Sequence, residues 1–392
     1  MLNNFNFSFP TEIVFGKDSI NQLPDLIKKY SNGKVLLVYG KGSIIKNGIY
    51  DSVVNQLNKA KIDFVEHGGC TQNPETSYVN NGARVVIGNK VDFILAVGGG
   101  SVIDAAKGIA LLVKNNHRDG IWPYMSSKKE ILNDGLPIGV ILTSVGTGSE
   151  GNGSFIISNK ETSEKLGRSH LSSRPVFSIC DPCYTVSVGK LQTAYGCVDT
   201  VCHLLEQYFC KEESGFSDQL IIATLKNVIQ SSLAVKKNPN DIEARSNLML
   251  ASTFSLSYVL SLGKTLDWSA HKIEHSLSGI YGIAHAAGLA SIFPAWMKCA
   301  SKNEIIFKRI LTLGKDMDLL SKTDVGKNSV NRVINYFKKF FIDMGLSVNL
   351  TKLLGEKPDV DKIIRITLKN GGLGKVYPIN KKECLEIIQM AS

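Results

Sequence analysis

Residues 92–108 read DFILAVGGGSVIDAAKG, and this stretch decides the fold class of the chain. It opens with an apolar run typical of a buried strand, continues through three glycines and a serine, and ends in a helix-like segment. Two further apolar runs, KVLLVYG at 34–40 and PIGVILTS at 137–144, also lead into Gly- or Ser-rich turns. Strands that alternate with helices in this way predict a Rossmann-like α/β domain built on a parallel sheet.

The second half of the chain follows a different pattern. Segments such as LQTAYGCVDTVCHLLEQYF have helical periodicity, and strand-like runs become scarce after about Gly189. The length of 392 residues also favours more than one domain. We therefore expect an α/β domain over 1–189 and an all-α domain over 190–392.

Composition narrows the class of protein. The net charge is +10, with 45 Lys and Arg against 35 Asp and Glu, but the lysines are scattered and no Arg-rich block occurs, so no nucleic-acid partner is expected. The sequence has no run of about twenty apolar residues, which is the length that a membrane-spanning helix needs. The N-terminal sequence lacks the features of a signal peptide, and the eight cysteines show no framework spacing. These features predict a cytoplasmic protein with reduced thiols.

Glycine-rich loops follow each of the three expected strands. They are GKGSIIKNG from Gly40, GGGSVIDAAKG from Gly98 and TSVGTGSEGNGS from Thr143. The first departs from the dinucleotide fingerprint because Ile45 stands at the third glycine position. Free backbone N–H groups at the start of a helix nevertheless favour an anion. Three such loops predict a phosphate-binding crevice at the carboxyl ends of the strands.

Three of the seven histidines fall within DWSAHKIEHSLSGIYGIAH, residues 267–285. His271 and His275 are spaced to share one face of a helix, and Asp199 and His203 form a second pair with the same spacing. Gly279 and Gly282 are expected to break the helix before His285. Two pairs of this kind could bring several ligands to one ion.

Two metal-site interpretations compete for these residues. HKIEH matches the inverted zinc-protease motif H-x-x-E-H, with Glu274 as general base. The alternative places Asp199, His203, His271 and His285 around one divalent ion, with His275 nearby but not bound. Three imidazoles and a carboxylate suit Fe(II), Zn(II), Co(II) or Ni(II) better than Mg(II) or Ca(II).

Several motifs together resemble one known family. They include PTEIVFGKDSI from Pro10, YGKGSIIKNGIYD, GGGSVID, TGSEGN, GCVDTVCHLLEQY and the histidine-rich segment. The chain resembles the iron-containing (group III) alcohol dehydrogenases, and within them the butanol dehydrogenase and aldehyde reductase branch. The resemblance implies the fold that this family shares with dehydroquinate synthase, with an active site between the two domains and a homodimer or larger homo-oligomer.

The resemblance also implies roles for individual residues. The metal ligands would be Asp199, His203, His271 and His285, holding Fe(II) or, as second choice, Zn(II). His275 would lie near the nicotinamide, where it is our candidate for relaying the hydroxyl proton. The positions that match nucleotide-site residues of the family are Gly99, Gly100, Ser101, Asp104, Thr143, Ser149, Asn152 and Lys165.

The cofactor preference is predicted from the loop that follows residues 34–40. Gly40, Lys41, Gly42 and Ser43 offer no carboxylate for the ribose 2′-hydroxyl, whereas a lysine and small residues suit a 2′-phosphate. NADP(H) is therefore favoured over NAD(H), with Gly40, Gly42 and Ser43 at the cofactor.

The expected reaction is hydride transfer between NADP(H) and a primary alcohol or aldehyde, dependent on a divalent metal. Two further classes stay open beside the protease interpretation. A lyase related to dehydroquinate synthase would use NAD only transiently, and a metal or nucleotide sensor would bind the cofactor without turnover.

Overall fold

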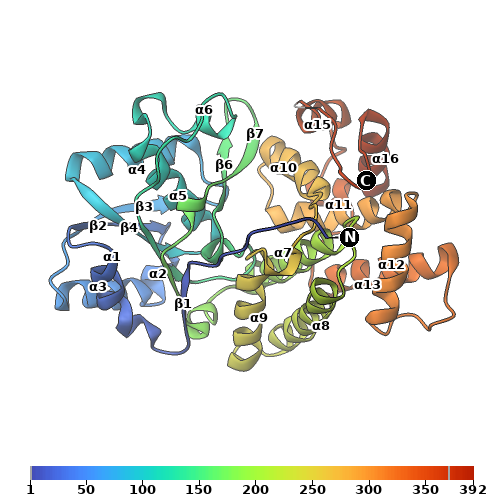
Figure 1. Ribbon diagram of the computed structural model, residues 1–392, viewed down its shortest axis with the longest axis horizontal. Helices are drawn as coiled ribbons and strands as arrows, with labels where there is room; N and C mark the ends of the chain where they lie inside the picture. Colours follow the sequence, from blue (N-terminus) through green and yellow to red (C-terminus); the bar gives the residue numbers. More distant parts are fainter. Residues whose placement is uncertain (1, 370) are drawn as a thin grey trace. The chain divides into compact units, whose positions relative to one another are not determined.

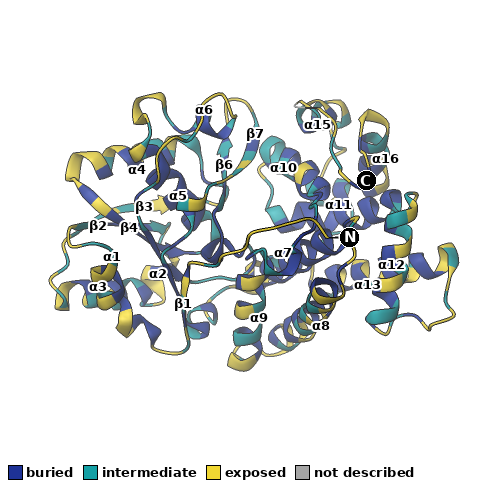
Figure 2. Ribbon diagram, in the orientation of Figure 1, coloured by how far each residue is buried: buried dark blue, intermediate teal, exposed yellow. Residues whose placement is uncertain are grey.

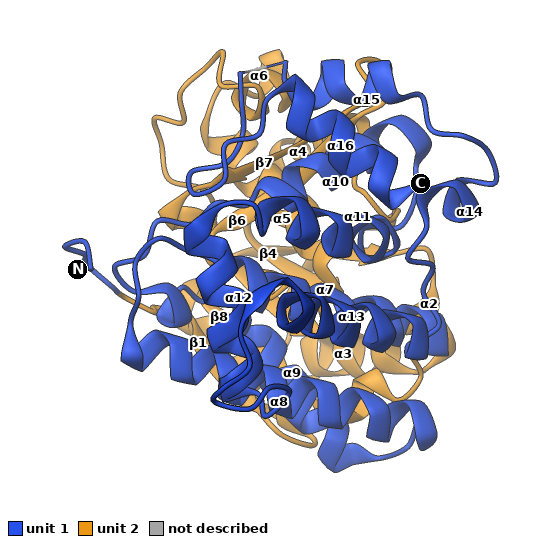
Figure 3. Ribbon diagram, turned by 90° about the vertical axis from the view of Figure 1, so that its right-hand side faces the viewer, with its two compact units in different colours: residues 1–7, 190–392 blue, residues 8–189 orange. Residues whose placement is uncertain are grey.

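The computed structural model describes residues 2–369 and 371–392, which divide into two compact units (Figure 3). One unit spans Ser8–Gly189, and the other combines the segment ending at Phe7 with Lys190–Ser392. The expected first domain began at residue 1, and this part of the prediction is wrong. Asn3 donates its backbone N–H to the Gly263 carbonyl at 2.9 Å and its amide to Thr265 at 3.1 Å, so the N-terminal segment packs with the helical unit.

The unit over Ser8–Gly189 contains a six-stranded sheet whose paired strands all run parallel. In spatial order the strands are β1 (Glu12–Phe15), β8 (Phe177–Cys180), β5 (Ile138–Leu142), β4 (Val91–Gly98), β2 (Lys34–Gly40) and β3 (Phe64–Cys70). The three strands expected from the sequence are β2, β4 and β5, which confirms the parallel α/β prediction. These three strands are the most apolar because they lie inside the sheet, with helices on both faces.

Helices cover both faces of this sheet (Figure 1). On one face, α1 (Leu23–Tyr30) and α3 (Ile49–Lys59) bury Leu37, Phe93 and Leu95. On the other, α4 (Thr76–Asn89) packs with α5 (Gly100–Lys114). The shorter elements of this unit are α2 (Ser43–Lys46), α6 (Trp122–Met125), the antiparallel hairpin β6 (Ser154–Asn159) and β7 (Glu164–Ser169), and the 3-10 helices η1 (Ser19–Gln22), η2 (His117–Asp119), η3 (Ser149–Gly151), η4 (Leu171–Ser173) and η5 (Pro182–Thr185).

The strand order determines where a ligand is expected. From β2 the chain moves outward to β3, then crosses back to β4 and continues in the opposite direction through β5 and β8. The direction of winding therefore reverses between β2 and β4. In open parallel sheets the carboxyl ends of the strands at such a reversal are the usual ligand-binding position. The loops that begin at Gly40 and Gly98 follow these two strands.

The helical unit carries no strand among its described residues. It comprises α7 (Lys190–Tyr208), α8 (Gly215–Lys237), α9 (Ile242–Ser255), η6 (Val259–Ser261), α10 (Ser269–Tyr281), α11 (His285–Ala300), α12 (Glu304–Asp316), α13 (Gly326–Asp343), α14 (Leu350–Leu354), α15 (Val360–Thr367) and α16 (Lys381–Ala391). Figure 2 shows that α11 is buried along most of its length. Helices α7, α10, α13 and α16 each pack against α11. None of the described helices is long and apolar enough to cross a bilayer.

A buried ionic cluster joins three segments of the helical unit. The Asp218 carboxylate on α8 accepts two hydrogen bonds from the Arg309 guanidinium on α12, at 2.6 and 2.8 Å. It also forms an ion pair with Lys264. Arg309 also stacks over the Tyr208 ring, 3.9 Å from its centroid. Burial alone would raise the pKa of Asp218, but the hydrogen bonds from Arg309 and Lys264 outweigh it and lower that pKa below its usual value.

The substitution Asp218→Asn is expected to destabilise the helical unit by about 3–5 kcal/mol, because it leaves two buried cations without their counter-charge. The side chain of Lys264 is 0% exposed and that of Arg309 only 3%, so water cannot replace the carboxylate. Urea denaturation followed by circular dichroism measures the change. The control is Asp318→Asn, which removes the ion pair of an 84% exposed carboxylate with Lys226 and should change stability by less than about 1 kcal/mol. Equal effects of the two variants would contradict the prediction.

Candidate functional site

Two helices of the second unit and the start of a third carry the residues predicted to bind metal. Asp199 and His203 lie one turn apart on α7, His271 lies in the first turn of α10, and His285 is the first residue of α11. Gly282 ends α10 with a left-handed conformation at φ +67°, as expected of a C-terminal glycine. Gly279 does not break the helix, and that part of the prediction is wrong. The single turn after Tyr281 is sufficient to reverse the chain.

The imidazoles of three histidines surround the carboxylate of Asp199. Its Oδ1 atom lies 3.6 Å from Nε2 of His203, 3.9 Å from Nε2 of His271 and 3.6 Å from Nε2 of His285. One donor atom each from Asp199, His271 and His285 falls within 4.8 Å of the others. His203 lies outside this group of three, and its ring stacks on that of His271 at 4.8 Å between centroids.

The other ring nitrogens of two of these histidines contact buried carboxylates. Nδ1 of His271 is hydrogen-bonded to Glu206 on α7, and Nδ1 of His285 is hydrogen-bonded to Glu274 on α10. Both glutamates are almost fully buried. Glu206 was not among the predicted residues, although its position two turns after Asp199 on the same helix was an available signal.

His275 lies beside this cluster. Its ring is 5.4 Å from that of His285, and its donor atom forms a second close group with atoms of Glu274 and His285. Glu274 is fully buried and accepts hydrogen bonds from Ser278 and His285. A general base must reach a water molecule or substrate. The protease interpretation of HKIEH therefore gains no support from the position of Glu274.

Two cysteines on α7 lie near these ligands in sequence. Cys197 and Cys202 are both fully buried. Burial raises the pKa of the Cys197 thiol to about 11 and that of Cys202 well above its usual value. Both side chains therefore occupy the apolar core of the helical unit, as small buried hydrophobic residues do.

The glycine loops of the first unit meet at the carboxyl edge of its sheet. Gly99 is the N-cap of α5, and a Cβ atom there would lie 2.1 Å from Oγ of Ser144. A Cβ atom on Gly100 would lie 2.5 Å from Cγ2 of Thr147. Thr143 donates its N–H to the Gly98 carbonyl at 3.1 Å. The loop after β4 thus packs directly on the loop after β5, and only glycine permits this approach.

The loop after β2 lies at the same edge. Gly40 is the last residue of β2, and a Cβ atom placed on it would lie 3.6 Å from the carbonyl oxygen of Cys70. The Sγ atom of Cys70 in turn lies 3.5 Å from the carbonyl oxygen of Ser101. Gly42 adopts φ +123°, and a Cβ atom there would meet no other atom within 4 Å. Ser43 begins α2. The structure therefore brings Gly40 close to the start of α5, and Gly42 and Ser43 follow it in the same loop.

A fully buried lysine, Lys107 on α5, organises the loop that leads into β6. Its ammonium donates to the carbonyls of Ser149, Asn152 and Ser154 at 2.6, 2.8 and 2.8 Å. Burial lowers the pKa of Lys107 to about 7, although Asp104 and Glu150 oppose this shift. Lys107 was not among the predicted site residues. A single cation within the apolar segment that follows GGGS was the available signal.

Asp104 and Lys165 lie close to the same loop. The Asp104 carboxylate accepts from Ser149 Oγ at 2.7 Å and from the Ile156 N–H at 3.1 Å. Burial raises the pKa of Asp104 to about 6, while Lys107 and Lys165, among others, act to lower it. Lys165 is buried on β7, opposite Ser158. Asp104 is thus positioned to brace the loop, whereas its expected contact with a pyrophosphate stays a prediction.

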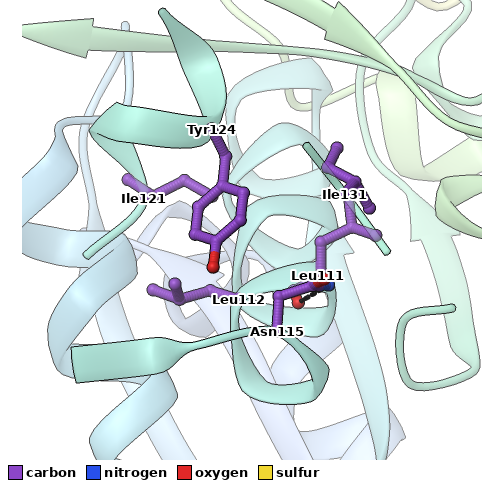
Figure 4. Close-up of a pocket in the computed structure, with 6 residues that line it drawn as sticks. All are labelled: Leu111, Leu112, Asn115, Ile121, Tyr124 and Ile131. Carbon is purple, nitrogen blue, oxygen red and sulfur yellow. Dashed lines mark hydrogen bonds between the residues drawn. The ribbon is translucent and has the colours of Figure 1, made fainter. Parts of the chain in front are cut away.

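A recess near the C-terminal end of α5 is too narrow to hold a ligand. Leu111, Leu112, Asn115, Ile121, Tyr124 and Ile131 line it (Figure 4). The Asn115 amide donates to the Leu111 carbonyl at 2.8 Å and to the Asn133 carbonyl at 3.1 Å, so it is engaged within the protein. The space between these side chains does not admit a water molecule. This recess is a packing feature of the α/β unit.

Comparison with protein families accounts for almost the whole chain. The model described as iron-containing alcohol dehydrogenase matches residues 10–182, and the model for the C-terminal part of the Fe-containing alcohol dehydrogenase family matches residues 193–392. The chain belongs to the iron-containing alcohol dehydrogenase family. The resemblance noted from the sequence motifs is confirmed, and so is the expected class of enzyme, an NAD(P)-dependent oxidoreductase.

Individual relatives in the iron-containing alcohol dehydrogenase family agree. The chain is 36% identical over 390 residues to the probable NADH-dependent butanol dehydrogenase 1 of Bacillus subtilis, covering 99% of each chain. It is 35% identical over 295 residues to the NADPH-dependent aldehyde reductase YqhD of Escherichia coli, covering 75% of each. The crystal structure of NADH-dependent butanol dehydrogenase A from Thermotoga maritima superimposes with a TM-score of 0.94 at 35% identity, covering 100% of this chain and 99% of that one.

Membership in the iron-containing alcohol dehydrogenase family implies iron and a nicotinamide cofactor, and the donor chemistry around Asp199 fits the metal. Imidazole nitrogens with one carboxylate oxygen suit Fe(II) and its neighbours in the first transition row. Metal-bound histidines commonly present one nitrogen to the ion and hydrogen-bond a carboxylate through the other. His271 and His285 each have this arrangement, with Nε2 toward Asp199 and Nδ1 on a glutamate.

Proposed function

We propose that this protein transfers a hydride between NADP(H) and a primary alcohol or aldehyde, with one divalent ion held by Asp199, His203, His271 and His285. Fe(II) is the first choice of ion and Zn(II) the second. The observation that carries the proposal is the convergence of three Nε2 atoms on one oxygen of Asp199, within 3.9 Å. The dehydrogenase and reductase names of the relatives support the same reaction.

Each group of residues has a defined task in this reaction. A divalent ion bound there would act as a Lewis acid on the substrate oxygen, and the nicotinamide would accept or supply the hydride. The loops from Gly40, Gly98 and Thr143 would bind the nucleotide through free N–H groups and the start of α5. Holding the nicotinamide in one orientation would contribute to the rate, because less freedom of motion is then lost in the transition state.

His275 is proposed to relay the hydroxyl proton. It is partly exposed, and its ring lies 5.4 Å from that of His285, so it can serve a substrate near the ligands without binding the ion. One imidazole nitrogen can accept a proton and the other can donate one, as such a relay requires.

The preference for NADP(H) is proposed from the loop after β2. Lys41 is exposed in this loop, and a Cβ atom placed on the neighbouring Gly42 would meet no other atom within 4 Å. The carboxylate of Glu66 on the neighbouring strand β3 already accepts the hydroxyls of Tyr39 and Tyr50, at 2.7 and 2.9 Å. Relatives divide on this point, since butanol dehydrogenases are named for NADH and YqhD for NADPH. A homodimer or larger homo-oligomer and a cytoplasmic location are also proposed, both on the resemblance to the iron-containing alcohol dehydrogenase family.

Metal-stripped protein is expected to be inactive with butanal and to regain NADPH oxidation when Fe(II) or Zn(II) is added back. We expect kcat/KM for NADPH to exceed that for NADH by about tenfold or more, since one charge-assisted contact contributes about 1.5–3 kcal/mol. Lys41→Ala should remove most of this preference. Absorbance of the reduced cofactor measures both effects, with and without metal.

The matched control is Lys46→Ala, which removes a nearby lysine of α2 and should leave the ratio unchanged. Stoichiometric metal without turnover of either cofactor would contradict the dehydrogenase proposal and favour the lyase or the sensor. A preference for NADH that Lys41→Ala does not alter would contradict only the cofactor assignment.

A further inference from the structure

Two buried glutamates contact the predicted metal ligands from behind. We infer that Glu206 and Glu274 are positioning residues that fix the rings of His271 and His285 for an ion, and that Gly288 exists to make room for Glu274. This inference rests on the proposed metal site. Of the three residues, only Glu274 had a predicted role, as the general base of the protease interpretation.

Glu206 holds both the ring and the backbone of His271. It lies on the same helix as Asp199, and the spacing 199, 203, 206 places all three residues on one face of α7. Its carboxylate accepts from Nδ1 of His271, from the N–H of Ala270 at 2.9 Å and from the N–H of His271 at 3.4 Å. One side chain therefore anchors the first turn of α10 to α7 and orients the imidazole that this turn carries.

Glu274 performs the same task for His285 from the other side. Its Oε2 accepts from Nδ1 of His285, and its Oε1 accepts from Ser278 one turn later on α10. Both carboxylate oxygens are thus engaged, and the side chain is 0% exposed. Glu274 thus links the middle of α10 to the first residue of α11 and orients the ring of that residue.

Gly288 is the third part of this arrangement. It lies one turn after His285 on α11, facing Glu274. A Cβ atom at this position would lie 2.7 Å from Oε1 and 2.8 Å from Cγ of Glu274. These separations are too short for non-bonded atoms, and Glu274 is enclosed on all sides. A side chain at 288 therefore requires Glu274 or α11 to move, and we expect this movement to disturb the contact between Glu274 and His285.

The chemical consequence is the same for both rings. A carboxylate at Nδ1 requires the proton on that nitrogen, which leaves the lone pair on Nε2. Both Nε2 atoms face Asp199 Oδ1. The glutamates therefore select the ligating tautomer, fix the ring direction and increase the basicity of the nitrogen that binds the ion.

The test measures metal binding by purified full-length protein that has been stripped of metal. Co(II) and Zn(II) dissociation constants are determined by chelator competition for wild type, Glu206→Gln, Glu274→Gln and Gly288→Ala. Each variant is expected to bind about 10–100-fold more weakly than wild type. The visible absorption of bound Co(II) should also change, because that absorption depends on the direction of the ligating rings.

Two controls separate positioning from general stability. Glu212→Gln alters another carboxylate of the helical unit, which bonds Thr265 at 2.9 Å but no histidine. Gly88→Ala places a methyl group on α4 where a Cβ meets no atom within 4 Å. Both should bind metal within about twofold of wild type, the scatter expected at sites remote from the ligands. Thermal unfolding of each metal-free variant checks its fold.

Each outcome distinguishes the inference from the function on which it rests. Variants that fold like wild type but bind metal weakly, with altered Co(II) absorption, support the inference. Folded variants that bind as tightly as wild type overturn it and leave the proposed enzyme intact. A wild-type protein that binds neither ion overturns both. If Gly288→Ala fails to fold, the two Gln variants still decide between the first two outcomes.

Discussion

Asp199→Asn is expected to abolish stoichiometric metal binding and to lower kcat/KM for aldehyde reduction by about a thousandfold, equivalent to roughly 4 kcal/mol of transition-state stabilisation. The reason is geometric as well as electrostatic. Oδ1 of Asp199 is the atom that the Nε2 atoms of His203, His271 and His285 all face, within 3.9 Å. Asparagine keeps the shape of the side chain but removes the negative charge that complements a divalent cation.

Metal content and steady-state kinetics with NADPH measure the effect of this substitution. Asp361→Asn is the matched control, because Asp361 is an exposed carboxylate near the start of α15. It should retain full metal content and activity. An Asp199→Asn protein that keeps its metal and its activity would exclude the four-ligand site. Circular dichroism establishes that the variant is folded, so that misfolding is not mistaken for loss of the ion.

Lys107→Met is expected to lower the stability of the α/β unit by about 3–5 kcal/mol, the loss typical when one partner of a buried charged network is removed. Three carbonyls, from Ser149, Asn152 and Ser154, lose their shared donor, and methionine cannot replace it. The loop that carries Ser149 and Asn152 is part of the proposed nucleotide site. We therefore expect KM for the cofactor to rise more than kcat falls, and metal binding to stay unchanged.

Denaturation by urea and cofactor saturation curves measure the two effects of Lys107→Met. Lys160→Met is the control, since Lys160 pairs with Glu75 at the surface with a 78% exposed side chain. Its stability should change by less than about 1 kcal/mol. If Lys107→Met leaves both stability and KM unchanged, the network around Lys107 is not what orders the loop.

The fold was predictable where local patterns carry the information. Strands β2, β4 and β5 lie inside the sheet, and their continuous apolar runs follow from burial on both faces. Strand β3 reads FVEHGGC and lies at the sheet edge, where its mostly uncovered residues leave no such run. The hairpin β6–β7 was missed for a similar reason, since both strands mix polar and apolar residues.

The candidate site divides in the same way. The helical spacing of Asp199 with His203 on α7 can be seen along the chain, and so can the return of the chain at Gly282 to His285. The burial and the hydrogen bonds of Glu274 could not be predicted from the sequence. The motif HKIEH suggested that Glu274 is a general base, whereas the packing of α10 on α11 buries its side chain. A motif specifies residue types but not their access to solvent.

Periodicity and spacing along the chain were therefore enough to identify the parallel sheet, the helical second half, the glycine loops and the candidate ligands. Packing was needed to decide which of these residues meet. His271 and Glu206 lie 65 positions apart, and Lys107 reaches carbonyls 42 to 47 positions away. Such contacts depend on how α7, α10 and α11, or α5 and its neighbouring loop, lie against one another. No local sequence pattern encodes that arrangement, because each hydrogen bond joins elements whose relative position is fixed by the core as a whole.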